Sequence, residues 1–217
     1  MSNDVIKHGN GKKIIDDWNT LPNLVTFSRI ALVVVYLVFL ICAGPFGVEN
    51  NVFRLVSAIL FIVAASTDKL DGYLARKRDE VTDLGKLMDP IADKLLICAT
   101  LIVLSFFGEL AWWITALFLI REIGITVLRF FVIEEGGKVI AASQLGKYKT
   151  LTQCLGLALL LLVPVYFIFS TVSNVSLVLY YAGFALVGVS LALCLFSGGM
   201  YVYNVVKSGA LKRSREE

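Results

Sequence analysis

Histidine is almost absent from this chain, since His8 is the only one and it lies in the polar stretch 1–20. Histidine is the side chain that most often serves as a general acid or base and as a metal ligand near neutral pH. If the protein is an enzyme that transfers protons, its base must therefore be a carboxylate, a lysine or a tyrosine.

Cysteine also offers no ligand set. The four cysteines lie inside apolar runs, and no two of them have the Cys-x-x-Cys spacing. This placement predicts small buried apolar residues and excludes a disulfide framework or a zinc site.

Nucleic-acid binding has no support beyond a net charge of +3, so no nucleic acid is expected among the partners.

Charged residues are scarce, at 17% of the chain, whereas soluble domains contain about 25%. Hydrophobic residues make up 58%, the mean hydropathy is +0.79, and the apolar residues form long runs. Each run approaches the roughly 20 residues that cross a bilayer. We predict an all-α integral membrane protein with a six-helix domain over 21–207, a polar N-terminal segment 1–20 and a basic tail 208–217. The predicted spans are 24–43, 52–76, 84–107, 110–133, 149–170 and 176–204.

Lysine and arginine are missing from alternate connections between these spans. The connections near 44–51, 108–110 and 171–175 have none, with Arg54 just beyond the first. Basic residues gather at both termini and in the other connections. The positive-inside rule then predicts a multi-pass protein of the cytoplasmic (inner) membrane, with both termini on the cytoplasmic side.

Four carboxylates, Asp68, Asp71, Asp89 and Asp93, lie within 26 residues of this apolar chain. Charges are unfavourable beside a bilayer, so such a cluster indicates a functional site. Spacings of three and four place each pair on one helix face, and the short connection between the second and third spans brings the pairs together. Ligands that are all oxygen favour magnesium, manganese or calcium over zinc. The pattern predicts metal-assisted phosphate chemistry at the cytoplasmic boundary.

The residues around these aspartates form a longer motif. Asp68-Lys69-Leu70-Asp71-Gly72-Tyr73-Leu74-Ala75-Arg76 is followed, after eight residues, by Gly85-Lys86-Leu87-Met88-Asp89-Pro90-Ile91-Ala92-Asp93. This stretch resembles the signature of the CDP-alcohol phosphotransferases at all of its defining positions. The resemblance implies six transmembrane helices around a polar cavity open to the cytoplasm, which agrees with the count of spans, and it implies a homodimer.

The same resemblance implies a role for each position. Asp68, Asp71, Asp89 and Asp93 would bind Mg²⁺ or Mn²⁺, as a site for two ions. Asp93 would also be the catalytic base that takes the proton of the acceptor hydroxyl. The residues expected to surround the cytidine diphosphate are Asp68, Gly72, Ala75, Arg76 and Gly85, together with Asn23 and Thr26 at the start of the first span.

Basic residues further along the chain indicate the acceptor. Arg121 and Arg129 lie in the fourth span, eight residues apart and thus on nearly one face, while Lys147 and Lys149 open the fifth. An intramembrane arginine normally faces a polar cavity, and its fork suits phosphate. These residues, with 21–29 and 137–153, resemble the phosphatidylglycerophosphate synthase branch, in which basic residues hold the phosphate of glycerol 3-phosphate. The expected reaction transfers a phosphatidyl group from CDP-diacylglycerol to glycerol 3-phosphate and releases CMP. The expected partners are therefore these two substrates and the membrane lipids.

Other interpretations stay open at this stage. Arg121 paired with Glu122 has a purely structural explanation, and Lys147 and Lys149 have one as interfacial anchors. A sister enzyme would use inositol phosphate, serine or phosphatidylglycerol, although serine needs no pocket for a phosphate. A divalent-metal channel or transporter is the alternative from another class. It is disfavoured because all four aspartates lie near one membrane face.

Overall fold

The computed structural model describes the backbone of residues 21–78, 83–134, 144–169 and 174–207. Side chains are described within 27–67, 94–128, 131–132, 146–162 and 177–207. Over these residues the chain contains six α-helices, one short 3-10 helix and no strand. The all-α prediction is confirmed for this part of the chain. The predicted N-terminal segment 1–20 and tail 208–217 lie outside the described residues.

Each predicted span coincides with a helix. The helices are α1 (Leu21–Ala43), α2 (Asn51–Arg78), α3 (Asp83–Phe106), α4 (Trp112–Glu134), α5 (Gln144–Phe169) and α6 (Asn174–Lys207), and the 3-10 helix η1 is Pro45–Gly47. The largest difference is that α5 begins at Gln144 instead of 149. Hydropathy marks where a helix is apolar, whereas the hydrogen-bonded helix continues through the polar residues before that point.

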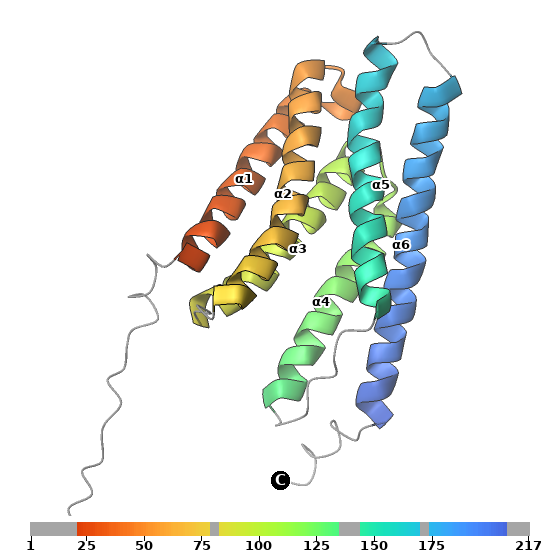
Figure 1. The fold of residues 1–217 in the computed structure, drawn as a ribbon. Helices are drawn as coiled ribbons and strands as arrows, with labels where there is room; N and C mark the ends of the chain where they lie inside the picture. The colour runs from red at the N-terminus through yellow and green to blue at the C-terminus, as the bar shows by residue number, and fades with distance from the viewer. Residues whose placement is uncertain (1–20, 79–82, 135–143, 170–173, 208–217) are drawn as a thin grey trace, which may run out of the picture.

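The helices form a closed ring in the order α1, α2, α5, α6, α4, α3 and back to α1, and α2 and α3 also contact each other. Figure 1 shows them running alternately up and down, so that α2 and α4 end, and α3 and α5 begin, toward the same lower end. Within the described residues, Leu177–Lys207 is long and apolar enough to cross a membrane, with shorter apolar stretches at Phe27–Ala43, Asn51–Thr67 and Lys94–Phe106. The six-span topology and the polar cavity stay predictions.

The helices α5 and α6 approach each other closely at positions where glycine replaces a larger side chain. A Cβ added at Gly156 of α5 would lie 2.9 Å from Val187 Cγ2 and 3.0 Å from the Val187 backbone nitrogen of α6. One at Gly183 would lie 3.2 Å from Leu159 Cβ. Small residues let helix backbones come this close and gain dispersion contacts along their length. The α5–α6 pair is therefore joined backbone to backbone.

At the upper end, the connection between α1 and α2 contains three residues in the left-handed region. Gly44 and Gly47 have φ of 71°, and Phe46 has φ of 52°. Such a conformation is uncommon for a side chain as large as Phe46. Its backbone N–H donates to Glu109 Oε1 at 2.7 Å, which holds the turn in place.

Glu109 also forms a fully buried ion pair with Arg54 of α2. Arg54 Nη1 and Nη2 donate to the two carboxylate oxygens at 3.0 and 2.5 Å, and the side chains are 0% and 3% exposed. Arg54 Nε and Nη2 also donate to the carbonyls of Leu161 and Leu160 of α5, at 3.2 and 3.4 Å. The Leu160 carbonyl lacks its usual partner four residues on, because Pro164 has no N–H. Arg54 thus joins α2, α5 and the α3–α4 connection.

Breaking this pair on one side should destabilise the protein strongly. Glu109→Gln leaves the Arg54 guanidinium buried without its counter-charge, a change that typically costs about 3–5 kcal/mol. Thermal unfolding in detergent micelles measures the effect. The double variant Arg54→Met, Glu109→Leu should recover part of the loss, because no charge is then buried. A single variant as stable as the parent protein would contradict the pairing.

The α5–α6 contact yields a second prediction. Gly156→Ala should destabilise by about 1–3 kcal/mol, because the new methyl group collides with Val187 and its backbone. Gly188→Ala on α6 is the matched control, since a Cβ there meets nothing within 4 Å. The control should be neutral or stabilising, because alanine favours the helix by up to about 1 kcal/mol over glycine. Equal melting temperatures for the two variants would rule out the close contact.

Candidate active site

The four aspartates occupy two consecutive helices that contact each other. Asp68 and Asp71 lie in α2, and Asp89 and Asp93 lie in α3. Their side chains lie outside the described residues, so the metal cage stays a prediction. The same holds for the positions predicted to surround the nucleotide: Asn23, Thr26, Gly72, Ala75, Arg76 and Gly85. In the part of the chain with described side chains, no group of three or more His, Cys, Asp or Glu residues is placed to hold a metal ion.

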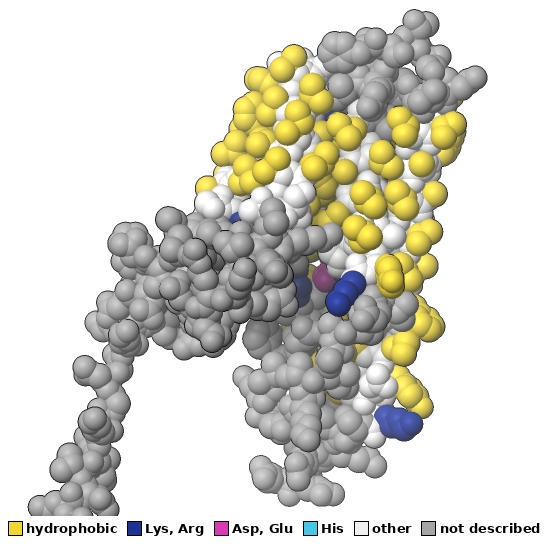
Figure 2. Space-filling model, viewed as in Figure 1, with side chains coloured by type: hydrophobic (Ala, Val, Ile, Leu, Met, Phe, Trp, Pro, Cys, Tyr) yellow, Lys and Arg dark blue, Asp and Glu magenta, His cyan; other side chains and the backbone are white. Residues whose placement is uncertain are grey.

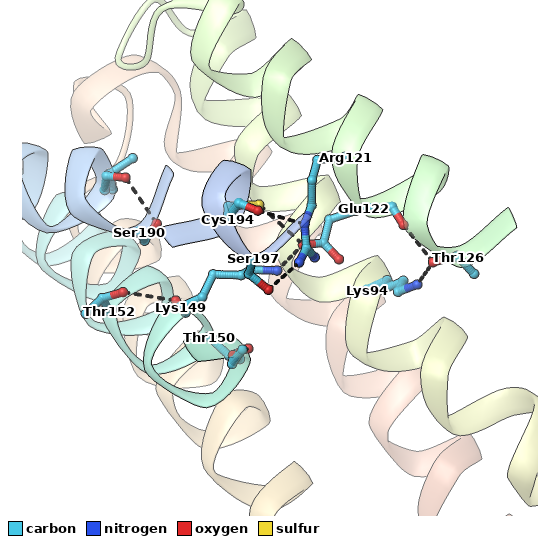
Figure 3. Close-up of polar contacts among 12 residues, drawn as sticks. Lys94, Arg121, Glu122, Thr126, Lys149, Thr150, Thr152, Ser190, Cys194 and Ser197 are labelled. Atoms are coloured by element: carbon cyan, nitrogen blue, oxygen red, sulfur yellow. Dashed lines mark hydrogen bonds and ion pairs between the residues drawn. The ribbon is translucent and has the colours of Figure 1, made fainter. Parts of the chain in front are cut away.

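A polar cluster with Glu122 at its centre joins α3, α4, α5 and α6 (Figure 3). Glu122 Oε1 accepts from Arg121 Nη1 at 3.3 Å and from Lys149 Nζ of α5. The side chains of Arg121, Glu122 and Lys149 are 15%, 13% and 8% exposed. We call the whole group the Glu122 cluster; its members are Lys94, Arg121, Glu122, Thr126, Lys149, Cys194 and Ser197.

Two cations share one carboxylate at the centre of the cluster. Arg121 and Lys149 both contact Glu122, so the three side chains together have one positive charge in excess. An unbalanced charge is unfavourable where solvent is largely excluded. An anionic group between the two cations would balance it and would receive charge-assisted hydrogen bonds from both. The arrangement therefore suits a phosphate.

Arg121 is held by α6 as well as by Glu122. Its Nε donates to the Cys194 carbonyl at 3.0 Å, and its Nη2 contacts Ser197 Oγ at 3.1 Å. Each arm of the guanidinium and the Nε therefore has a fixed partner. Contacts of this kind restrict the rotamers of a long side chain, so less entropy is lost when it binds a ligand.

Lys94 connects the cluster to the helix that contains the predicted base. Its Nζ donates to Thr126 Oγ1, and the Thr126 hydroxyl donates to the Glu122 carbonyl at 2.6 Å. Lys94 directly follows Asp93 in α3. The cluster thus contacts α3 at the residue that follows Asp93. That the two predicted parts form one site stays a prediction.

The face of the molecule seen in Figure 2 is apolar in its upper part and carries charged side chains below. On the face seen in Figure 2, apolar side chains cover the upper part of the molecule. Acidic atoms appear between basic side chains where this apolar surface ends, farther down. On this face, most of the described charged side chains that can be seen lie below the apolar upper part.

The four predicted acceptor residues have different surroundings. Arg121 and Lys149 come together on Glu122. Lys147 is exposed, and residues two apart in a helix do not face the same way. Arg129 lies in α4, but its side chain is outside the described residues. The geometry therefore favours Arg121 and Lys149 as the centre of the predicted phosphate site.

Several members of the cluster were not predicted as site residues. From the sequence, Glu122 is expected only as a structural partner of Arg121, and Lys94 and Thr126 have no expected role. Gln153 of α5, outside the cluster, is a further buried polar residue without a predicted role: it is 2% exposed, and its Nε2 has no hydrogen-bond partner among the described residues. Helical spacing gives a signal for Thr126 and Gln153, because each lies four residues after a cluster member. No sequence pattern indicates a role for Cys194 or Ser197.

Within the described residues, the helical ring holds a cation-rich cluster that contacts one helix of the aspartate-bearing pair, an arrangement that suits phosphate groups. Comparison with known proteins agrees. A family model described as CDP-alcohol phosphatidyltransferase matches residues 19–196. The chain therefore belongs to the CDP-alcohol phosphatidyltransferase family and is an enzyme, as its motif predicted.

The names of individual relatives agree with the phosphatidylglycerophosphate synthase branch of the family. The chain is 41% identical over 148 residues to a CDP-diacylglycerol–glycerol-3-phosphate 3-phosphatidyltransferase of Bacillus subtilis, covering 65% of this chain and 76% of the relative. It is 44% identical over 142 residues to a probable phosphatidylglycerophosphate synthase of Mycobacterium tuberculosis, with coverage of 65% and 66%. A Salmonella paratyphi A relative with the same name as the first is 34% identical over 186 residues, with coverage of 84% and 92%.

Proposed function

We propose that this protein transfers the phosphatidyl group of CDP-diacylglycerol to glycerol 3-phosphate, giving phosphatidylglycerol phosphate and CMP. The names of the relatives support both substrates. The observation on which the choice of acceptor chiefly rests is the Arg121 and Lys149 pair on Glu122. Lys94 of α3, the residue after Asp93, contacts the same cluster through Thr126.

The aspartates suit a divalent cation. Asp68 and Asp71 are three residues apart in α2, and Asp89 and Asp93 are four apart in α3, so each pair lies on one helix face. This donor set is oxygen only, which fits Mg²⁺ or Mn²⁺, and two ions match the four carboxylates. When bound, such ions neutralise a diphosphate and favour departure of the nucleotide.

Asp93 takes the proton of the acceptor hydroxyl in the proposed reaction. The oxygen then attacks the phosphorus on the lipid side, a new P–O bond forms, and the P–O bond to CMP breaks. Gly72, Ala75 and Gly85 leave room for the cytidine diphosphate, and Arg76 pairs with its phosphate. Asn23 and Thr26 of α1 contact the same headgroup. Holding both substrates in line turns the encounter into an intramolecular step.

The acceptor phosphate lies between Arg121 and Lys149, where it balances the excess positive charge. Arg129 follows Arg121 on nearly the same face of α4 and extends this basic lining. Lys147, which is exposed, attracts the anion from the aqueous side. Inositol phosphate presents the same anionic group, so a direct comparison of acceptors decides between the two.

The protein acts as a multi-pass homodimer in the cytoplasmic membrane, with its termini and active site on the cytoplasmic side. Lys147 at the start of α5 and Lys207 at the end of α6 support this orientation, since they mark one end of the ring with positive charge. The nucleotide and the acceptor arrive from the cytoplasm, while the lipid donor enters from the bilayer.

Purified protein in detergent should release CMP from CDP-diacylglycerol when glycerol 3-phosphate is added, and a chelator should abolish the release.

Asp93→Asn should lower kcat at least about a hundredfold, because general bases contribute about 10²–10⁴-fold. A panel with inositol phosphate, serine and phosphatidylglycerol identifies the acceptor. Metal flux in liposomes without CMP release would refute the proposal and favour a transporter.

Lys149→Ala should raise the KM for glycerol 3-phosphate about ten- to a hundredfold, the usual effect of losing a charge-assisted hydrogen bond. The KM for the lipid donor should change little. Lys147→Ala, the same change on the exposed side of α5, should have a clearly smaller effect. Equal effects of the two variants would assign both lysines to long-range attraction of the anion.

A further inference from the structure

The Arg121 side chain lies directly across Gly198 of α6. A Cβ built on Gly198 would lie 3.1 Å from Arg121 Cγ and 3.2 Å from Arg121 Nε. Contacts of this length are tighter than ordinary van der Waals packing. A side chain at this position therefore requires Arg121 to shift by a few tenths of an ångström. Gly199, the next residue of the same helix, differs completely, since a Cβ there meets nothing within 4 Å.

Gly198 also leaves open the carbonyl that Arg121 uses. In an α-helix the Cys194 carbonyl accepts from the N–H four residues later, which belongs to Gly198. A carbonyl has a second lone pair, and Arg121 Nε–H occupies it at 3.0 Å. Side chains in a helix lean toward the preceding turn, so a side chain at 198 would lean over this carbonyl. Glycine keeps it accessible.

The contacts use part of the guanidinium and leave the rest for a ligand. Arginine has five N–H donors. Nε binds the Cys194 carbonyl, Nη1 binds Glu122 and Nη2 contacts Ser197. Among the described residues, three of the five donors are engaged, which leaves one N–H on each of Nη1 and Nη2. The side chain is 15% exposed, so the fixed guanidinium is partly accessible to a ligand.

We propose that the segment 194–198 of α6 is a positioning element for the acceptor phosphate, and that Gly198 is the residue on which it depends. The proposal rests on the proposed function, because it assigns a purpose to the fixed Arg121. Cys194 and Ser197 set the direction of the guanidinium, and Gly198 lets its stem lie against the helix. Gly198 is a positioning residue, since its effect on the substrate passes through Arg121.

The test compares Gly198→Ala with Gly199→Ala. The two variants make the same change one residue apart, so they share the same gain in helix propensity. Gly198→Ala should raise the KM for glycerol 3-phosphate roughly tenfold, the effect of losing about one hydrogen bond to the phosphate. The KM for CDP-diacylglycerol should change less than about twofold. Gly199→Ala should leave both constants unchanged.

A double-mutant cycle with Arg121→Ala shows whether the effect passes through the arginine. Coupled residues give non-additive changes. In the Arg121→Ala background, Gly198→Ala should therefore have no further effect on the KM for glycerol 3-phosphate. Additive effects would overturn the proposal. If Gly198→Ala does not insert or fold, Ser197→Ala gives the same test, with a smaller rise in this KM and the same loss of effect in the double variant.

The results separate this proposal from the one on which it rests. If the parent protein releases no CMP with glycerol 3-phosphate, or if Arg121→Ala leaves the KM for glycerol 3-phosphate unchanged, the proposed acceptor site is wrong. If the parent protein is active and Arg121→Ala raises that KM, yet Gly198→Ala behaves like Gly199→Ala, only the positioning role is wrong.

Discussion

Charged side chains buried between apolar helices need partners inside the protein, and in this molecule those partners join helices that are distant in the sequence. Arg54 of α2 binds Glu109, which follows α3, and two carbonyls of α5. The same Glu109 holds the turn at Phe46. One buried ion pair thus closes the upper end of the ring. It also explains how a cation is tolerated next to a connection that otherwise lacks basic residues.

The Glu122 cluster also joins distant helices through buried charged side chains, toward the lower end of the ring. Its positive and negative charges, however, do not cancel. Arg54 and Glu109 neutralise each other, whereas Arg121 and Lys149 share a single carboxylate. The first arrangement is complete without a ligand and has no need of one. The second keeps one positive charge that an added anion would balance. Their charge balance therefore distinguishes a structural pair from the group that we propose as a binding site.

The positions of the helices could be predicted from the sequence, because apolar runs reflect a local requirement of the bilayer. The aspartate motif was also evident, since its residues lie close together along the chain. The pairing of Arg121 with Cys194, Ser197 and Gly198 could not be predicted. It depends on how α4 and α6 are rotated and how closely they pack, and neither property appears in a local pattern. Lys147 and Lys149 looked equivalent in sequence, yet only the turn of α5 decides which one is buried.

The backbone contact between α5 and α6 at Gly156 and Gly183 has a consequence for how the enzyme responds to its lipid surroundings. Bilayers differ in thickness, and helices adapt to the mismatch by tilting. Two helices packed without intervening side chains tilt together as one unit. Lys149 on α5 and the support of Arg121 on α6 then keep their spacing while the pair tilts. Under the proposed function, the geometry of the acceptor site would therefore change little with the thickness of the bilayer.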